Sequence, residues 1–309
     1  MFKQITRLRV IGNSCRVRQF SSSSIQWEES KRNIRSFPWL LHNDPPRIEQ
    51  YPYAHASGPF SLLNILPTFI QHASSVRLAS RTLYLNTGFS YFPEQFLLGA
   101  TMATRRALEV LSQHLTDPSN EARREELEQM MNPMLLARLE QGAKKALGLH
   151  DEVLLSVPQI YDANLGDIWL TLGNPRAFIT PREYDVFEWM TIQVGMKKTN
   201  DADEESFGDA RMRVARGLLE GAHVRVDVKV DADVVYKVNR GDDILLYDEG
   251  RRTLLVQFET PYFEPADKMV SSRDENGEPI NDWSWRISDI DQLLTKEKLD
   301  GSSDENDQE

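Results

Sequence analysis

The stretch AHVRVDVKVDADV, residues 222–234, alternates apolar and charged side chains. Successive side chains of an extended chain point to opposite faces, so the two kinds of residue separate completely. On one face lie Val224, Val226, Val228 and Val230, and on the other Arg225, Asp227, Lys229 and Asp231. This period of two predicts a half-buried antiparallel strand. The charged row, with Asp233, is interpreted as a solvated face rather than a metal site.

Other segments after residue 150 have the composition of strands. Residues 244–263 are predicted to form two strands around an Asp248-Glu249-Gly250 turn, with Asp242 and Asp243 in a polar loop. Residues 153–162 and 167–173 are predicted to form a hairpin around Asn164–Gly166. Residues 186–196 and 282–290 complete the set, and in the latter Trp283 and Trp285 are interpreted as core residues rather than a ligand platform.

Residues 60–148 instead repeat apolar residues at helical spacing. A first helix is predicted over 61–86, and a second begins near Ser90, with Pro93 in its first turn. The second helix carries one apolar stripe, formed by Phe96, Ala100, Ala103, Ala107 and Leu111. Ser119 is expected to cap a third helix, and Asn132-Pro133 begins a fourth. Helices followed by meandering strands predict an α+β fold, with N-terminal helices packed on a curved antiparallel β-sheet.

The first 20 residues carry five bases and no acid, although the whole chain has 47 acids and 36 bases. Such a composition is typical of a mitochondrial transit peptide. Arg18, Phe20 and Ser21 resemble a matrix processing site with cleavage before the serine. Removal of residues 1–20 would make the net charge of −11 more negative by five units, which disfavours nucleic-acid binding. The alternative is a basic arm that binds nucleic acid.

Composition also divides the rest of the chain. Residues 21–59 are predicted to form a Pro-rich linker, and residues 60–294 a single α+β domain. Within that domain, the polar residues 197–216 are expected to be a mobile insertion. Residues 295–309 are expected to form an acidic, disordered tail.

Signatures of catalysis are absent from the sequence. It contains no phosphate-binding glycine loop, no zinc-protease motif, no nucleophile elbow and no paired cysteines, and its sole cysteine is Cys15. The acids around Asp242 and Asp248 lack the spacing of a calcium loop. We therefore expect no catalytic residues, no cofactor and no metal.

An absence of a different kind marks the window from Gln50 to Pro93, which holds no acid in 44 residues. About seven would be expected at the average density of the chain without residues 1–20. The window combines bulky apolar residues with two arginines, and its candidate membrane or partner contacts are Leu62, Leu66, Phe69, Ile70, Arg77 and Arg81. Apolar residues that enter the interface beside arginines that face headgroups would suit an anionic lipid such as cardiolipin. A core helix followed by a neutral loop is the alternative.

Residues 84–115, YLNTGFSYFPEQFLLGATMATRRALEVLSQHL, and residues 127–140, LEQMMNPMLLARLE, resemble the matrix m-AAA protease-interacting proteins. These belong to the wider group that shares the C-terminal domain of the inner-membrane import-motor tether. The matching features are Phe89-Ser90, the Phe96-x-x-Gly99-Ala100 helix, and the closing Asp282-Trp283 and Arg286-Ile287. The resemblance covers residues 84–175 and 221–292, and residues 197–216 depart from it.

The resemblance implies a cone-like α+β domain in the mitochondrial matrix, peripheral on the inner membrane. It also implies a chaperone-like adaptor without enzymatic activity. Its partners would be m-AAA protease subunits, and it would assist the import, sorting, maturation or assembly of inner-membrane client proteins. A mitoribosome receptor for membrane insertion of mitochondrial translation products is the first alternative. A small dehydratase or isomerase, with a His or carboxylate in an apolar cavity, is the second.

Overall fold

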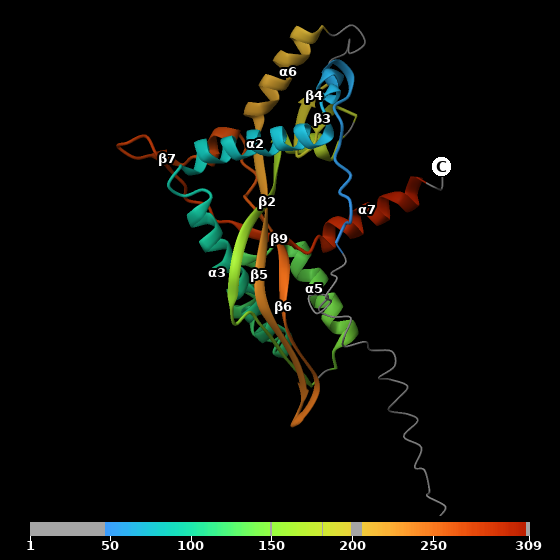
Figure 1. The fold of residues 1–309 in the computed structure, drawn as a ribbon, viewed down its shortest axis with the longest axis vertical. Helices are drawn as coiled ribbons and strands as arrows, with labels where there is room; N and C mark the ends of the chain where they lie inside the picture. The colour runs from blue at the N-terminus through green and yellow to red at the C-terminus, as the bar shows by residue number, and fades with distance from the viewer. Residues whose placement is uncertain (1–46, 149, 181, 199–205, 307–309) are drawn as a thin grey trace, which may run out of the picture. The chain divides into compact units, whose positions relative to one another are not determined.

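The computed structural model describes residues 47–148, 150–180, 182–198 and 206–306 (Figure 1). The predicted transit peptide and linker residues 21–46 lie outside this range. The helices are η3 (Gly58–Ile65), α2 (Thr68–Thr87), α3 (Glu94–Thr116), α4 (Glu121–Met130), α5 (Pro133–Ala146), η4 (Pro175–Phe178), α6 (Phe207–Glu220), η6 (Ala266–Met269) and α7 (Leu293–Asn306). The strands are β1 (Asp151–Ser156), β2 (Ile160–Gly173), β3 (Tyr184–Trp189), β4 (Ile192–Lys197), β5 (Ala222–Arg240), β6 (Asp243–Glu259), β7 (Ser272–Arg273), β8 (Pro279–Ile280) and β9 (Arg286–Ile290).

The main sheet has the order β3-β4-β2-β5-β6-β9, and β1 pairs with the far half of β5. The long strands β5 and β6 curve together along its length (Figure 1). This confirms the α+β fold with a curved sheet. All its neighbouring strands are antiparallel except β2 and β4, which are parallel. The sheet is therefore mixed, because the chain crosses over through η4 and β3 before β4 joins β2.

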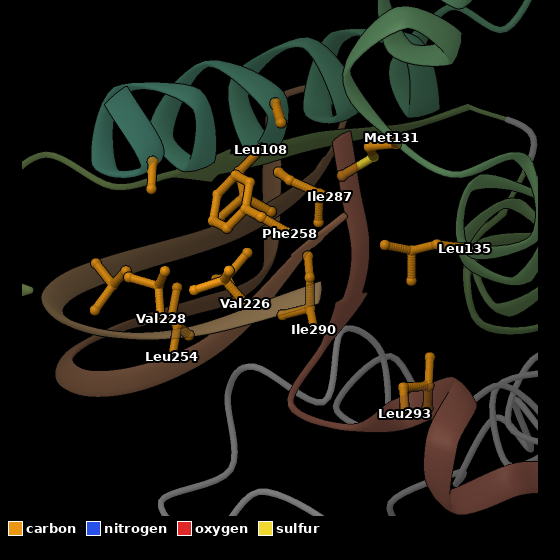
Figure 2. Close-up of a cluster of buried hydrophobic side chains, with 14 of the residues drawn as sticks. Leu108, Met131, Leu135, Val226, Val228, Leu254, Phe258, Ile287, Ile290 and Leu293 are labelled. Atoms are coloured by element: carbon orange, nitrogen blue, oxygen red, sulfur yellow. The ribbon is translucent and has the colours of Figure 1, made fainter. Parts of the chain in front are cut away.

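β5 is the strand predicted from the alternating stretch, and its apolar face is fully buried. Val226 and Val228 pack with Leu108 of α3, Leu135 of α5 and Phe258 of β6 in the core (Figure 2). The predicted stripe of α3 faces this core as well, with Ala103 half-buried and the other four residues buried.

Helix starts follow the local sequence. Asn132 caps α5 by accepting the Met134 N–H at 2.9 Å, as predicted. The prediction for α4 was wrong by one residue, because Asn120 and not Ser119 accepts the Arg123 N–H. The Ser119 hydroxyl is instead bound to Asp117, at 2.7 Å.

Three strand predictions were wrong. β6 runs through the predicted Asp248–Gly250 turn, and the chain reverses instead at Gly241, whose φ of 60° suits a glycine. β1 pairs with β5 and not with β2, because β2 continues through Asn164 with a bulge near Leu165. Residues 186–196 contribute to two strands, β3 and β4, which meet at Met190.

Three segments predicted to lack structure contain ordered elements. Residues 207–220 form α6, which begins at the Ser206 cap and packs Ala210 and Gly217 inward. Residues 293–306 form α7, because the Asp289 carboxylate accepts the backbone N–H groups of its first turn. Residues 47–57, which belong to the predicted linker, run along the sheet, where Ala54 forms a bridge with Met190, and the last two linker residues begin η3.

Candidate functional site

Helix α2 follows the acid-free segment η3 and organises the candidate site. Its buried side repeats at four-residue intervals, at Gln71, Ser75, Ala79 and Leu83. Side chains four apart lie on one face of a helix, so the opposite face, with Arg77 and Arg81, is exposed. The position of α2 thus determines where both arginines lie.

Buried polar contacts fix α2 against the sheet. The Trp189 indole donates to Gln71 Oε1 at 3.1 Å, and the Gln71 amide donates to the Leu66 carbonyl at 2.7 Å. Beside them, the Thr191 hydroxyl donates to Ser75 Oγ at 3.1 Å. Polar groups removed from water are costly unless paired, so these contacts favour one orientation of α2 on the turn between β3 and β4.

The four predicted apolar contacts lie on the surface. Leu62 belongs to η3, Leu66 follows it, and Phe69 and Ile70 occupy the first turn of α2. They are 37–73% exposed, and the neighbouring Ile65 is 76% exposed. The alternative of a core helix does not hold for these four residues. Clustered exposed apolar residues commonly mark a protein or membrane interface.

An open groove of about 750 Å³ separates α2 from β2 and β5. Arg77 and Arg81 line its helix side, and Lys229 lines its sheet side. Among the described residues, none of these three cations forms an ion pair or a side-chain hydrogen bond. The two arginines predicted as site residues therefore share the groove with a third cation, which belongs to the charged face of β5.

The acid that lines this groove is Asp167. Its Oδ1 lies 2.9 Å from His72 Nε2, and its Oδ2 accepts a hydrogen bond from the Tyr53 hydroxyl. Burial, followed by that hydrogen bond, raises the pKa of Tyr53, so this hydroxyl stays protonated and donating. Asp167 carries one negative charge against the three positive charges of Arg77, Arg81 and Lys229, so the excess charge of the groove is positive and suits an anion.

A second polar cluster lies on the same face of β5 but outside the groove. Asp227 was predicted to be solvated, and that prediction was wrong, because it is buried beneath Trp169 and Tyr51. Its carboxylate accepts from the Trp169 indole at 3.0 Å and from the Gln257 amide at 2.8 Å. Burial raises its pKa, against the effect of these two hydrogen bonds.

Asp227 is therefore held by two neutral donors and is not among the groove-lining residues. The dehydratase alternative calls for a His or a carboxylate in an apolar cavity, and the groove is lined by one of each, His72 and Asp167, which are bonded to each other. No group of three or more metal-ligating side chains occurs in the described residues.

Sequence patterns missed two contributors to this site. Lys229 belongs to the alternating charged face and lies outside the acid-free window, so no local signal linked it to α2. His72 lies inside the window, but its partner Asp167 is 95 residues away. The predicted processing residues Arg18, Phe20 and Ser21 lie outside the described residues.

None of the helices in the described parts of the chain is long and apolar enough to cross a bilayer.

No protein-family model matches the chain, and no curated protein matches its sequence.

Proposed function

We propose that this chain is a non-enzymatic adaptor that attaches peripherally to an anionic membrane, at the matrix face of the mitochondrial inner membrane. There it associates with the m-AAA protease and assists newly imported inner-membrane proteins. The observation that carries the proposal is the surface of η3 and α2. It combines exposed apolar side chains with Arg77 and Arg81, and Lys229 of β5 lies on the other side of the groove; none of the three cations has an acidic partner among the described residues.

The two parts of this surface contribute differently to membrane attachment. Each basic residue near an anionic surface contributes about 1 kcal/mol, so Arg77 and Arg81 together supply about 2 kcal/mol. Full burial of a Leu or Phe side chain supplies about 1.5–3 kcal/mol, so full insertion of Leu62 and Phe69 together would contribute more than the two arginines. The apolar part is insensitive to salt, whereas the part from exposed charges is screened over about 10 Å at 0.1 M salt.

The adaptor role rests on the sequence resemblance to the m-AAA protease-interacting proteins. The resembling residues 84–175 and 221–292 correspond to α3 through β2 and to β5 through β9, the parts that form the main core. The groove supports a binding role, since three cations and a single acid line it and give it an excess of positive charge. The N-terminal composition supports the mitochondrial location.

Vesicle flotation tests the membrane contact. The purified full chain should float with vesicles that contain cardiolipin at low salt, and less at high salt. Changing Arg77→Ala and Arg81→Ala together should weaken binding by about 30-fold, the equivalent of about 2 kcal/mol. The matched control is Lys144→Ala with Lys145→Ala, which removes two exposed charges from α5. Equal loss in both double variants, or no binding by the wild type, would rule out this surface as the lipid contact.

Affinity purification from detergent-solubilised mitochondria tests the partner. Recovery of m-AAA protease subunits is the expected result. Recovery of mitoribosomal proteins without the protease would instead favour the ribosome receptor. Flotation and purification can fail separately, so a protein-mediated attachment would appear as protease recovery without vesicle binding.

A further inference from the structure

Helix α6 packs one side against the hairpin formed by β3 and β4. Ala210 and Gly217 are the residues that it buries. Gly217 lies close to β4, since an added Cβ would lie 3.3 Å from Val194 Cγ1. Next to this buried side, the Arg213 guanidinium donates to the Asp185 carboxylate of β3 at 3.0 Å. These contacts determine which side of α6 faces away from the hairpin.

The outer side of α6 carries an apolar stripe. Successive residues of a helix are rotated by about 100°, so Met212, Ala215 and Leu219 lie opposite the buried side. All three are exposed, Met212 by 57% and Leu219 by 72%. Arg211 and Arg216 flank the stripe, one on each side, and neither has an ion-pair partner among the described residues. An apolar stripe bordered by arginines is typical of a helix that lies in a membrane interface.

The charge of α6 is nearly balanced, in contrast to that of α2. Three arginines and two acids, Asp209 and Glu220, give α6 a net charge of +1. Attraction to an anionic surface is therefore weak, and burial of the apolar stripe must supply most of any membrane binding. Because that contribution does not depend on charge, salt should hardly change it.

Segment η3 lies beside α6 on the same face of the hairpin. The ring centroid of Phe60 in η3 is 5.0 Å from that of Phe187 in β3 and 5.8 Å from that of Phe207, the first residue of α6. Phe187 and Val194 lie directly opposite each other in the pairing of β3 with β4, so both side chains project from one face. Phe60 packs on this face at Phe187, and α6 packs on it at Val194.

The outer sides of η3 and α6 together form one apolar surface. Leu62 and Ile65 of η3 are 70% and 76% exposed, and Phe207 at the start of α6 is 58% exposed. Both elements rest on one face of the hairpin, so their exposed side chains point away from it in the same general direction. The hairpin and α6 lie at the same end of the main sheet (Figure 1). A flat partner such as a bilayer can therefore contact both elements at once.

We propose that α6 is a second membrane contact, with Met212 and Leu219 inserted among lipid acyl chains and with Arg211 and Arg216 at the headgroups. The inference rests on the proposed membrane attachment, which assigns the contact to η3 and α2 alone. The apolar side of an interfacial helix enters about 5–10 Å into the boundary between headgroups and acyl chains, and long arginine side chains reach back to water. Two contacts side by side also fix the orientation of the domain on the bilayer, which a single contact leaves free to rotate.

Vesicle flotation of two matched double variants tests the proposal. In the purified full chain, Met212→Gln with Leu219→Gln should weaken binding to vesicles that contain cardiolipin at least about tenfold, because apolar burial is lost. The fold loss should be similar at low and high salt, unlike that of the double arginine variant of α2. The control is Leu98→Gln with Met102→Gln, a leucine and a methionine of α3 that are 64% and 66% exposed, and it should bind as the wild type does.

A fluorescent label gives a second measurement, which does not depend on weakened binding. In the full chain with Cys15→Ser, an environment-sensitive label is attached at Leu219→Cys. On addition of the vesicles, its emission should rise and should be quenched by lipids that carry a nitroxide on the acyl chain. The same label at Met134→Cys, which is 69% exposed on α5, should show neither change.

The outcomes separate this inference from the proposed function. If the wild type floats but the α6 variant floats equally well, or the label at residue 219 is not quenched, the α6 contact is wrong and the contact of η3 and α2 stands. Equal losses in the α6 and α3 variants would also overturn it. If the wild type does not float, both membrane contacts are wrong. An α6 variant that floats normally but no longer recovers m-AAA protease subunits would assign this side of α6 to a protein instead.

Discussion

Substitution Phe96→Ala should destabilise the protein more than a change at an exposed position of the same helix. Phe96 is 2% exposed and lies where α3 meets the sheet. Its ring centroid is 4.8 Å from Trp285, 5.5 Å from Phe92 and 5.9 Å from Phe258. Truncation would thus open a cavity lined by three aromatic rings.

The expected cost is about 3–5 kcal/mol, the range measured for buried Phe→Ala changes. The aromatic contacts favour the upper part of this range, since each contributes about 0.5–1.5 kcal/mol beyond its buried area. A domain of ordinary stability unfolds at a cost of about 5–15 kcal/mol, so the variant should remain folded but lose a large share of its stability.

Urea unfolding followed by tryptophan fluorescence measures the effect. With a slope of about 3 kcal/mol per M, the midpoint should fall by about 1–1.7 M. Leu98→Ala, two residues along the same helix but 64% exposed, is the control and should change stability by less than about 0.5 kcal/mol. A loss of stability below about 1 kcal/mol for Phe96→Ala, or equal losses in both variants, would show that the face of α3 that carries Phe96 is not buried.

Three further substitutions test other parts of the structure. The raised pKa of Asp227 means that its ionisation weakens folding as pH rises above the unfolded value of about 3.9. In urea titrations, Asp227→Asn should therefore gain stability relative to wild type as pH rises, and a difference constant with pH would contradict this. Gln71→Ala should cost about 1–3 kcal/mol in the same assay, because the Trp189 indole loses its acceptor; an unchanged midpoint would count against the contact. Gly173→Ala should destabilise by more than about 2 kcal/mol or prevent folding, because at its φ of 106° an added Cβ would lie 2.1 Å from the Gly195 carbonyl oxygen; a variant of wild-type stability would show this backbone to be wrong.

Periodicity predicted the parts of the fold that pack on one core. The alternation from Val224 to Val230 and the stripe of α3 each describe a surface that packs on a single neighbouring layer. Alternation alone could not predict the burial of the charged residues of β5, because they lie in different environments. Asp227 is buried beneath Trp169, whereas Asp231 pairs with the Arg251 guanidinium at the surface.

The pairing of strands and the helix in the charged C-terminal segment could not be predicted, because they depend on residues distant in sequence. The Asp248–Gly250 stretch has the composition of a turn, yet it stays extended because β5 pairs with it throughout. α7 forms in a charged sequence because Asp289, on the preceding strand, bonds its first turn. Local propensity gives no information about partners so distant in sequence.

The candidate site was predicted in part. The absence of acids pointed to Leu62, Phe69, Arg77 and their neighbours, and the structure places these side chains at the surface. The groove itself exists only because α2 lies against β2 and β5, so Lys229 could not be assigned to it from sequence.

The continuity of β5 limits how the length of this protein can vary among its relatives. From Val224 to Val238, every second residue is completely buried on the core face of the sheet. A single-residue insertion within this strand would turn every later side chain to the opposite face, and so place charged residues in the core. At Gly241, by contrast, an added side chain meets only open space. Natural insertions and deletions should therefore gather at this turn, in even numbers that preserve the pairing of β5 with β6.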